Sequence, residues 1–235
     1  MVRQLNNSKC YVWQSEELET PLTSEQFDLD HWRDQPGYAE LSGGRGATAR
    51  ITLDEQQVIL RRYYRGGMVG KLLTDQYLWL GKSMTRPWRE WQILDRAYRA
   101  NLPVPKPIAA CVCRKGWWYY AAIITGYLAN TETFAARLQT STVPSSLWNQ
   151  LGQIIRRLQE EGICHPDLTV TNILIDDKDR LYLIDFDKAK IKPRLDDWQW
   201  GPLHRLQRSC NKFNREYRPD YAGDDWQALM DGYQG

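Results

Sequence analysis

Three polar side chains bracket a predicted β-hairpin in the second half of the chain. Asp167 precedes Asn172 by five residues, and Asp185 follows Asn172 by thirteen. Because a hairpin brings its two ends together, these three side chains can converge at one mouth. The oxygens of Asn172 and Asp185 suit Mg²⁺, and Asp167 can accept a proton from an attacking hydroxyl. The spacing therefore indicates phosphoryl transfer, which requires a positioned hydroxyl, a metal ion and a polyphosphate.

The hairpin itself is predicted from two short apolar runs, NILI and RLYLI, separated by the turn DDKD. A hairpin with solvated turn acids accounts for Asp176, Asp177 and Asp179, so we assign these three residues no role. That interpretation does not account for an Asp and an Asn placed inside the apolar frame. The functional interpretation is therefore preferred for Asp167 and Asn172.

The segments upstream of the hairpin predict a part of the chain that is rich in strands. Alternation with period two predicts strands around a glycine turn in residues 41–67, and the run WWYYAAIIT predicts another strand. Residues 85–100 and 145–163 have the apolar spacing of amphipathic helices. Residues 1–40 are acidic and turn-rich, and we expect them to form an extension packed on the first lobe.

The order of these elements predicts an α+β fold in two lobes that share a ligand cleft. Residues 1–126 are expected to form an N-terminal lobe with an antiparallel sheet and one helix. Residues 127–235 are expected to form a compact, mainly helical catalytic lobe. A chain of 235 residues is long enough for this, because it can bury a sizeable core.

Composition and cysteine usage are typical of a soluble globular protein with reduced thiols. The chain is 42% hydrophobic and 26% charged, and none of its apolar runs approaches the ~18 residues that a membrane-spanning helix needs. The N-terminus has no apolar core behind its basic residues, so no signal peptide is expected. The cysteines are odd in number, and the two-residue interval between Cys111 and Cys113 is not a zinc spacing. All of them are therefore expected to be reduced.

Charge is unevenly distributed although the net charge is only +2. Residues 59–106 hold ten Lys or Arg against three Asp or Glu, and residues 188–218 hold nine against three. Two basic blocks in a nearly neutral chain indicate a surface that meets something anionic. Solvated helix faces would explain the same counts, so charge alone does not decide between the two interpretations.

The polar residues around the hairpin resemble the active site of protein-kinase-like enzymes. HPDLTVTN matches the catalytic-loop pattern H-x-D-x-x-x-x-N, and DFD stands where those enzymes carry D-F-G. Both motifs have the expected separation and the expected strands between them. This resemblance implies a bilobal kinase-like fold with ATP and Mg²⁺ as cofactors. It also implies that Asp167, Asn172 and Asp185 are catalytic, and that Asn172 and Asp185 hold the metal.

The same resemblance implies ATP-binding residues upstream. GGRGATAR stands where a phosphate-covering loop is expected, which assigns Gly43, Gly44, Arg45 and Gly46 to nucleotide binding; a simple hairpin turn is the alternative. VILR aligns with the strand that carries a phosphate-binding Lys in kinases and offers Arg61 in its place, with Arg62 or Lys71 as alternatives. Glu90 is the acid that would pair with this cation, and an exposed helix charge is the other interpretation. These candidate residues are Gly43, Gly44, Arg45, Gly46, Arg61 and Glu90.

Further segments resemble a narrower family, the 3-deoxy-D-manno-octulosonic acid (Kdo) kinases of lipopolysaccharide biosynthesis, which are relatives of the heptose kinases. The segments are GGRGAT, LRRYYRGGMVGKLLTDQYLW, TRPWREWQIL, LPVPKP and LIDFDKAKIKP, in that order. The resemblance covers residues 40–215. The chain departs from the family at Pro166, where a small residue is common, and at Thr169, where Asn is common. Asp167 and Asn172 are retained.

This resemblance implies ATP-dependent phosphorylation of the 4-hydroxyl of Kdo attached to a lipid A precursor. The acceptor would be an anionic glycolipid, which gives the two basic blocks a purpose. The enzyme would contact the membrane surface as a peripheral protein on the cytoplasmic face of the bacterial inner membrane. Neither a nucleic acid nor an obligate protein partner is expected.

Two other functions stay open at the level of the sequence. One is a soluble kinase-like phosphotransferase acting on a small sugar or alcohol, although such enzymes usually carry acidic acceptor pockets for cationic substrates. The other is a catalytically silent pseudokinase that binds nucleotide. Asp187 stands in place of the usual Gly, and the sequence leaves open whether it helps to hold metal or caps the turn.

Overall fold

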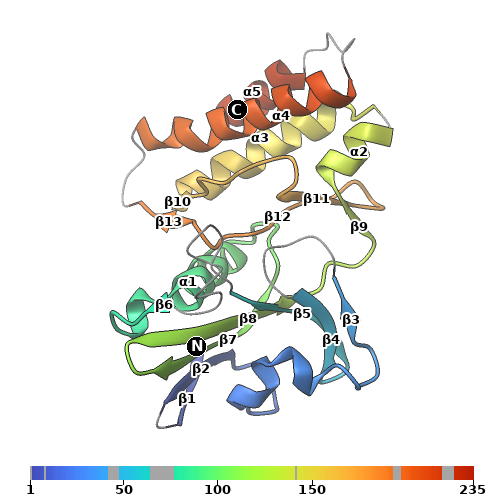
Figure 1. Cartoon of the computed structure of the whole chain (residues 1–235). Helices are drawn as coiled ribbons and strands as arrows, with labels where there is room; N and C mark the ends of the chain where they lie inside the picture. The colour runs from blue at the N-terminus through green and yellow to red at the C-terminus, as the bar shows by residue number, and fades with distance from the viewer. Residues whose placement is uncertain are drawn as a thin grey trace. The chain divides into compact units, whose positions relative to one another are not determined.

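The computed structural model describes two compact units (Figure 1). The residues that the structure describes are 2–7, 9–41, 48–63, 77–140, 142–192, 197–218 and 225–235. Unit 1 comprises Met1–Gln92 and Lys106–Tyr127, and unit 2 comprises Ile93–Pro105 and Leu128–Gly235. The predicted helix at 85–100 forms as α1 (Arg86–Arg99) and contributes its first residues to unit 1 and the others to unit 2. The α+β class predicted from the order of elements is confirmed.

Unit 1 is built on one antiparallel sheet in the order β1-β2-β7-β8-β5-β4-β3, with β6 paired to β8 (Figure 1). The period-two expectation holds in β4, where Ala49, Ile51 and Leu53 are buried and the residues between them are half-buried. The strands are β1 (Val2–Asn7), β2 (Cys10–Ser15), β3 (Ala39–Glu40), β4 (Thr48–Leu53), β5 (Gln56–Arg62), β6 (Tyr77–Leu78), β7 (Pro107–Lys115) and β8 (Trp118–Gly126).

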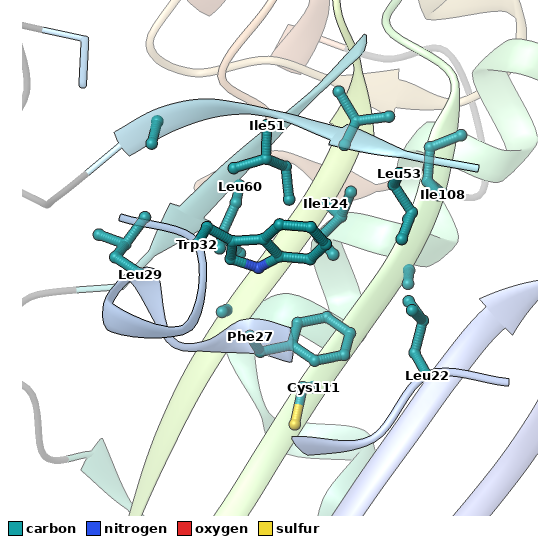
Figure 2. Close-up of a cluster of buried hydrophobic side chains, with 14 of the residues drawn as sticks. Leu22, Phe27, Leu29, Trp32, Ile51, Leu53, Leu60, Ile108, Cys111 and Ile124 are labelled. Atoms are coloured by element: carbon teal, nitrogen blue, oxygen red, sulfur yellow. The ribbon is translucent and has the colours of Figure 1, made fainter. Parts of the chain in front are cut away.

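The core of unit 1 lies between this sheet and the segment that precedes β3. Two short 3₁₀ turns, η1 (Ser24–Phe27) and η2 (Leu29–His31), place Phe27 and Trp32 against the sheet. Figure 2 shows the Trp32 ring beside Ile51 and Leu60. Part of the predicted N-terminal extension therefore packs on the sheet of unit 1, through Leu22, Phe27, Leu29 and Trp32. However, part of that extension forms β1 and β2, which the sequence analysis did not predict as strands.

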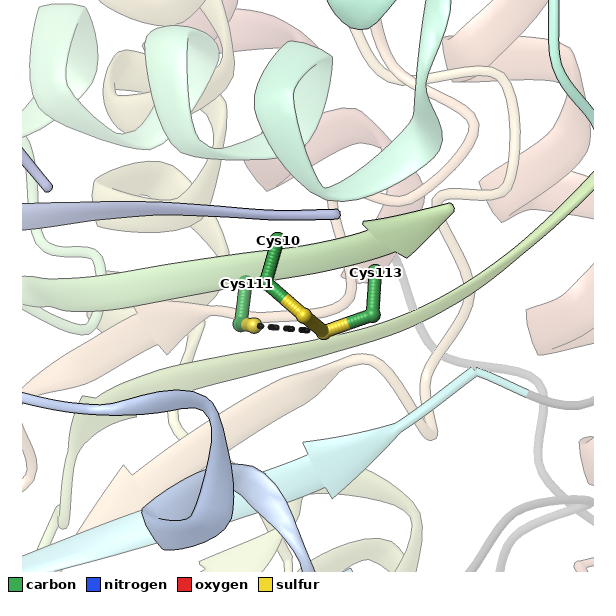
Figure 3. The surroundings of a disulfide bond; sticks show 3 residues. All are labelled: Cys10, Cys111 and Cys113. Carbon is green, nitrogen blue, oxygen red and sulfur yellow. Dashed lines mark hydrogen bonds between the residues drawn. A yellow bond between two sulfur atoms is a disulfide. The ribbon is translucent and has the colours of Figure 1, made fainter. Parts of the chain in front are cut away.

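A disulfide bond joins Cys10 of β2 to Cys113 of β7 (Figure 3). These residues lie directly opposite each other because β2 pairs with β7 in a register that sets Cys10 against Cys113. The prediction that all cysteines are reduced is therefore wrong for this pair. Cys111, Cys164 and Cys210 are free and buried, and the Cys111 sulfur lies 3.8 Å from that of Cys113.

Unit 2 is mainly helical and carries two small sheets. One sheet has the order β12-β11-β9, and the other pairs β10 with β13. The predicted hairpin forms as β11 and β12, with Ile173 opposite Leu183. The strands are β9 (Thr131–Thr133), β10 (Ile163–Cys164), β11 (Ile173–Asp176), β12 (Leu181–Leu183) and β13 (Lys190–Ile191), and the helices are α2 (Phe134–Thr140), α3 (Ser145–Glu160), α4 (Trp200–Tyr217) and α5 (Asp225–Gln234). Short 3₁₀ turns at Lys82–Met84 (η4) and Asp197–Gln199 (η5) precede α1 and α4.

Close packing of α3 on α5 stabilises unit 2. A Cβ added at Gly152 would lie 2.0 Å from the Leu229 carbonyl oxygen, and one at Gly232 would lie 2.0 Å from the Asn149 carbonyl oxygen. Any larger residue at either glycine would push the two helix backbones apart. Leu151, Ile154 and Leu158 of α3 are buried, as their spacing predicts. Among the helices that the structure describes, a search for a segment that could span a bilayer finds none.

Candidate active site

The loop between β10 and β11 holds Asp167 and Asn172 at its two ends. The Asn172 side-chain nitrogen donates a hydrogen bond to the Asp167 carbonyl oxygen at 2.9 Å, which closes the loop on itself. The Ile184 backbone nitrogen donates to the Asn172 carbonyl oxygen at 3.0 Å. Asp185 directly follows Ile184, so this backbone hydrogen bond places Asp185 next to Asn172. The structure thus brings the three predicted residues to one end of the hairpin.

His165 braces this loop. Its ring is buried, and its Nε2 lies 3.0 Å from the Ile184 carbonyl oxygen. Burial lowers the pKa of His165 below its usual value. The ring also meets Phe186 edge to face, with 4.8 Å between centroids. A buried, neutral imidazole in this position stabilises the loop.

The Asp167 carboxylate is held by two cations. The Lys188 ammonium lies 2.9 Å from Oδ2, and the Arg205 guanidinium lies 3.1 Å from Oδ1. The hydrogen bond from Lys188 lowers the pKa of Asp167 below its ordinary value; partial burial opposes this shift, and the hydrogen bond from Arg205 reinforces it. Asp167 is therefore ionised at neutral pH. Sequence reasoning placed both cations in a basic block but did not connect either one to Asp167.

Asp185 is exposed, and its backbone is in the left-handed region at φ 62°. Such a conformation is uncommon for a residue other than Gly, Asn or Asp. The buried Phe186 that follows it anchors the turn. No signal in the sequence other than the DFD motif indicated this backbone geometry.

A magnesium ion fits the oxygens that this loop offers. The Asn172 nitrogen binds the Asp167 carbonyl, so the Asn172 side-chain oxygen is the atom available for a metal, and Asp185 adds a carboxylate. No group of three or more His, Cys, Asp or Glu side chains arranged for metal binding occurs in the described part of the chain. One carboxylate and one amide still suit Mg²⁺, which usually completes its shell with waters and substrate phosphates.

A second polar cluster lies in unit 1 around Glu90 of α1. Glu90 is only 2% exposed. Its Oε1 accepts from the Arg61 guanidinium at 2.5 Å, and its Oε2 accepts from the buried Tyr63 hydroxyl. Burial, and next the charge of Glu90, raise the pKa of Tyr63 well above its usual value. The structure therefore forms the ion pair between Arg61 and Glu90 that the kinase resemblance suggested.

The alternatives to Arg61 are placed differently. Arg62 makes an ion pair with Asp28 at 3.3 Å. Lys71 lies outside the described residues, as do the proposed glycine-loop residues Gly43, Gly44, Arg45 and Gly46.

Sequence reasoning missed the aromatic residues of this cluster. The Arg86 guanidinium lies over the Tyr77 ring at 5.1 Å and over the Tyr63 ring at 5.6 Å. It also donates to the Tyr77 hydroxyl at 2.8 Å. The sequence segments RRYY, DQYLW and TRPW carry these residues, but the sequence analysis used them only as evidence for the family.

Comparison with known proteins identifies the family of this chain. Residues 30–233 match the family model described as the lipopolysaccharide kinase (Kdo/WaaP) family. The chain is 37% identical over 212 residues to a 3-deoxy-D-manno-octulosonic acid kinase of Vibrio parahaemolyticus, covering 90% of this chain and 89% of the relative. It is 37% identical over 218 residues to the enzyme of the same name from Haemophilus influenzae strain PittEE, covering 89% and 90%. A Vibrio cholerae relative of that name is 34% identical over 212 residues, covering 90% of each chain. The resemblance noted in the sequence is thus confirmed, and the chain belongs to the lipopolysaccharide kinase (Kdo/WaaP) family.

Proposed function

We propose that this protein transfers the γ-phosphoryl group of ATP to the 4-hydroxyl of Kdo attached to a lipid A precursor, in the synthesis of the lipopolysaccharide core. The observation that carries the proposal is the identity of 37% to 3-deoxy-D-manno-octulosonic acid kinases across about nine tenths of both chains. The arrangement of Asp167, Asn172 and Asp185 at one end of the hairpin supports it.

Asp167 is proposed as the group that receives the proton of the acceptor hydroxyl. Its carboxylate is ionised at neutral pH because Lys188 and Arg205 lower its pKa. A carboxylate with a low pKa is a weak base, so its main contribution is to orient the hydroxyl and to take its proton late in the transfer. The bond between Asn172 and the Asp167 carbonyl fixes the loop that carries this carboxylate.

Asn172 and Asp185 are proposed to hold Mg²⁺, which would neutralise charge on the phosphates when bound. In unit 1, Arg61 is proposed to bind the ATP phosphates. Glu90 holds the Arg61 guanidinium in one orientation, so its planar donors are presented without further ordering. Gly43, Gly44, Arg45 and Gly46 are proposed to cover the phosphates.

The acceptor sets the proposed location. A Kdo-bearing lipid A precursor is an anionic membrane lipid, so the enzyme is proposed to work as a peripheral protein at the cytoplasmic face of the inner membrane. The excess of Lys and Arg in residues 59–106 and 188–218 supports contact with such a surface.

The test is phosphate transfer from labelled ATP, with Mg²⁺, to a lipid A precursor with and without one Kdo residue. We expect label only on the Kdo-bearing lipid, and none with Asp167→Ala. Lys178→Ala is the matched control, because Lys178 is exposed at the turn between β11 and β12 and belongs to neither the Asp167 cluster nor the Glu90 cluster.

Two other results would contradict the proposal. Label on a small soluble sugar but on neither lipid would favour a small-molecule phosphotransferase. Binding of ATP with no transfer to any acceptor would favour a pseudokinase.

A further inference from the structure

Unit 1 exposes a compact group of large apolar side chains, which we call the apolar corner: Leu78, Leu80, Met84 and Trp117. Leu80 is 66% exposed and Trp117 is 76% exposed. Leu78 and Met84 are each about half exposed. The four residues come from two segments that are held together, because β6 pairs with β8 and the Trp79 backbone nitrogen donates to the Trp117 carbonyl oxygen at 2.9 Å. Exposed apolar side chains are ordinary when scattered, but a group like this one indicates an interaction site.

A rigid aromatic base supports the apolar corner. Trp79 stacks on Tyr11 with 5.7 Å between ring centroids, and it meets Tyr119 edge to face at 6.2 Å. The Arg114 guanidinium lies 5.5 Å from the centroid of the Trp79 ring. The exposed residues on either side of Trp79 are therefore presented by packed neighbours, so little ordering is needed when they bind a partner.

Among the described residues of the segments that form or support the apolar corner, the exposed charged side chains are cationic. Residues 9–13, 77–89 and 111–120 contain six Lys or Arg and no Asp or Glu. The exposed cations among them are Lys9, Lys82, Arg89, Arg114 and Lys115. Lys9 belongs to this group because its carbonyl oxygen accepts from the Arg114 backbone nitrogen at 2.7 Å. Exposed Leu, Met and Trp beside these exposed cations match an anionic lipid surface in both polarity and charge.

We propose that the apolar corner docks unit 1 onto an anionic bilayer. The side chains of Leu80 and Trp117 enter the boundary between headgroups and acyl chains, and the five exposed cations contact lipid phosphates. This inference deepens the proposed function, because it names the surface by which the enzyme would meet a membrane-embedded acceptor. Its test needs no acceptor and no turnover, so it can fail or succeed independently of the Kdo assignment.

The test is cosedimentation of the full chain with vesicles of phosphatidylcholine, with and without phosphatidylglycerol. We expect binding to the anionic vesicles that falls with added salt. The double variant Leu80→Glu with Trp117→Glu should lower the partition coefficient by about tenfold or more. Lys82→Gln with Lys115→Gln should weaken binding to the anionic vesicles by a similar factor and leave binding to neutral vesicles unchanged.

The matched control is Tyr98→Ser, which removes an exposed large side chain from the other end of α1 and should bind vesicles as the unmodified chain does. Circular dichroism of each variant separates lost binding from lost folding. Equal binding of the double Glu variant and the unmodified chain would overturn the proposal. So would concentration-dependent dimerisation through this surface without vesicle binding, because a second copy of the chain would then be its partner.

A separate observation concerns the cation beside Asp167. The residue two positions after Asp167 is Thr169, and residues 165–172 contain no Lys or Arg. Thr169 is buried, and its hydroxyl lies 2.9 Å from that of Thr171. That position therefore supplies no charge to the site.

Lys188 reaches the same carboxylate from another part of the chain. It follows Asp185 by three residues, and its ammonium lies 2.9 Å from Asp167 Oδ2. The Lys188 side chain is 64% exposed, so it is held by this contact more than by packing. An ammonium on a flexible stem carries several donors and can serve two acceptors at once.

We infer that Lys188 supplies the cation that Thr169 cannot, by contacting the transferring phosphoryl group. The acceptor oxygen forms a bond to the γ-phosphorus as the bond from that phosphorus to the ADP oxygen breaks, and the hydroxyl proton passes to Asp167. Lys188 donates to an oxygen of the phosphoryl group as it moves, which weakens its hold on Asp167 Oδ2 and leaves that oxygen for the incoming proton.

The test compares the affinities of a non-hydrolysable ATP analogue and of ADP, both with Mg²⁺, by titration calorimetry. This inference rests on the proposed use of ATP but not on the identity of the acceptor. Lys188→Ala should weaken binding of the analogue by about tenfold and leave binding of ADP unchanged. Lys188→Arg should restore most of the affinity, and Lys178→Ala should match the unmodified chain.

A second measurement separates contact with the phosphoryl group from an effect through Asp167 alone. Lys188→Ala should lower the affinity for the analogue by the same factor in a chain that carries Asp167→Asn as in the unmodified chain. Equal affinities of Lys188→Ala and the unmodified chain for the analogue would overturn the inference. An effect of Lys188→Ala that disappears in the Asp167→Asn chain would also overturn it.

Discussion

Each unit holds a carboxylate between two hydrogen-bond donors, but the two carboxylates differ in their burial. Glu90 in unit 1 is almost fully buried, and its partners are the half-buried Arg61 and the buried Tyr63. Asp167 in unit 2 is partly exposed, and its partners are the exposed Lys188 and the partly exposed Arg205. The bonds to Glu90 are part of the core, whereas those to Asp167 are made by side chains that water can also solvate.

Because of this difference, the contacts of Glu90 should be fixed, whereas those of Asp167 can change during the reaction. A buried ion pair is costly to break, because the remaining charge or hydroxyl loses its partner without gaining water. An exposed pair is worth little, because water replaces the lost partner. Glu90 should therefore matter most for the stability of its unit, and Asp167 should matter most for turnover.

The largest expected effect follows from replacing Asp167. Asp167→Ala and Asp167→Asn should each lower the rate of phosphate transfer by about a thousandfold or more, because the acceptor hydroxyl loses its orienting carboxylate. The free energy of unfolding should change by less than about 1 kcal/mol, because Lys188 and Arg205 stay solvated. Initial rates and urea unfolding at pH 7 provide the two measurements. A variant that keeps a tenth of the rate would remove Asp167 from the mechanism.

Glu90→Ala should show the opposite balance. We expect it to lower the free energy of unfolding by roughly 2–4 kcal/mol, because the buried Tyr63 hydroxyl and the Arg61 guanidinium both lose their acceptor. It should also weaken ATP binding, because Arg61 is no longer held in one orientation. Urea unfolding of Glu90→Ala beside Asp167→Ala makes the comparison direct. Equal losses of stability in the two variants would show that burial does not separate these carboxylates.

The sequence was most informative about side chains that come together within one short stretch of the chain. The sequence predicted that Asp167, Asn172 and Asp185 lie together, because one hairpin carries them and the spacing of a hairpin is local. Arg205 was not connected with Asp167 because it comes from α4, 38 positions further along the chain. Nothing in a helix pattern says which loop its side chains will meet.

The same limit explains the errors in unit 1. Strand β2 pairs with β7 about a hundred residues away, and only that pairing sets Cys10 opposite Cys113. An odd number of cysteines therefore suggested free thiols. The ion pair of Arg61 with Glu90 was anticipated only because the kinase resemblance supplied the partner. Charge patterns in the sequence would not have chosen Arg61 over Arg62.

Arg205→Ala tests how far the cations tune Asp167. Because Arg205 helps to lower the pKa of Asp167 below its ordinary value of 3.8, its removal should raise that pKa. The acid limb of the profile of kcat/KM against pH should therefore move to higher pH, and the rate at pH 7 should fall by about tenfold through loss of orientation. Arg205→Lys should restore the position of the limb. An unmoved acid limb would mean that Arg205 serves only the packing of α4.

Tyr63→Phe should have the smallest effect on stability among these variants. The dependence of this effect on pH tests whether the contact between Tyr63 and Glu90 is closed to water, unlike the contacts of Asp167. At pH 7 we expect a loss of about 1 kcal/mol in the free energy of unfolding, because Glu90 loses one hydrogen bond. Burial raises the pKa of Tyr63 well above its ordinary value of 10.0, so the folded chain keeps the proton while the unfolded chain releases it above pH 10. The contribution of Tyr63 is thus fully present below pH 10 and is lost as the pH rises beyond it.

The stabilities of Tyr63→Phe and the unmodified chain should therefore converge as the pH rises above 10. Tyr98→Phe, which changes an exposed tyrosine, is the matched control. The difference in free energy of unfolding between Tyr98→Phe and the unmodified chain should stay constant across this pH range. A constant difference between Tyr63→Phe and the unmodified chain across this range would mean that the Tyr63 hydroxyl ionises alike in both states. The contact with Glu90 would then be open to water, and the contrast with Asp167 would no longer hold.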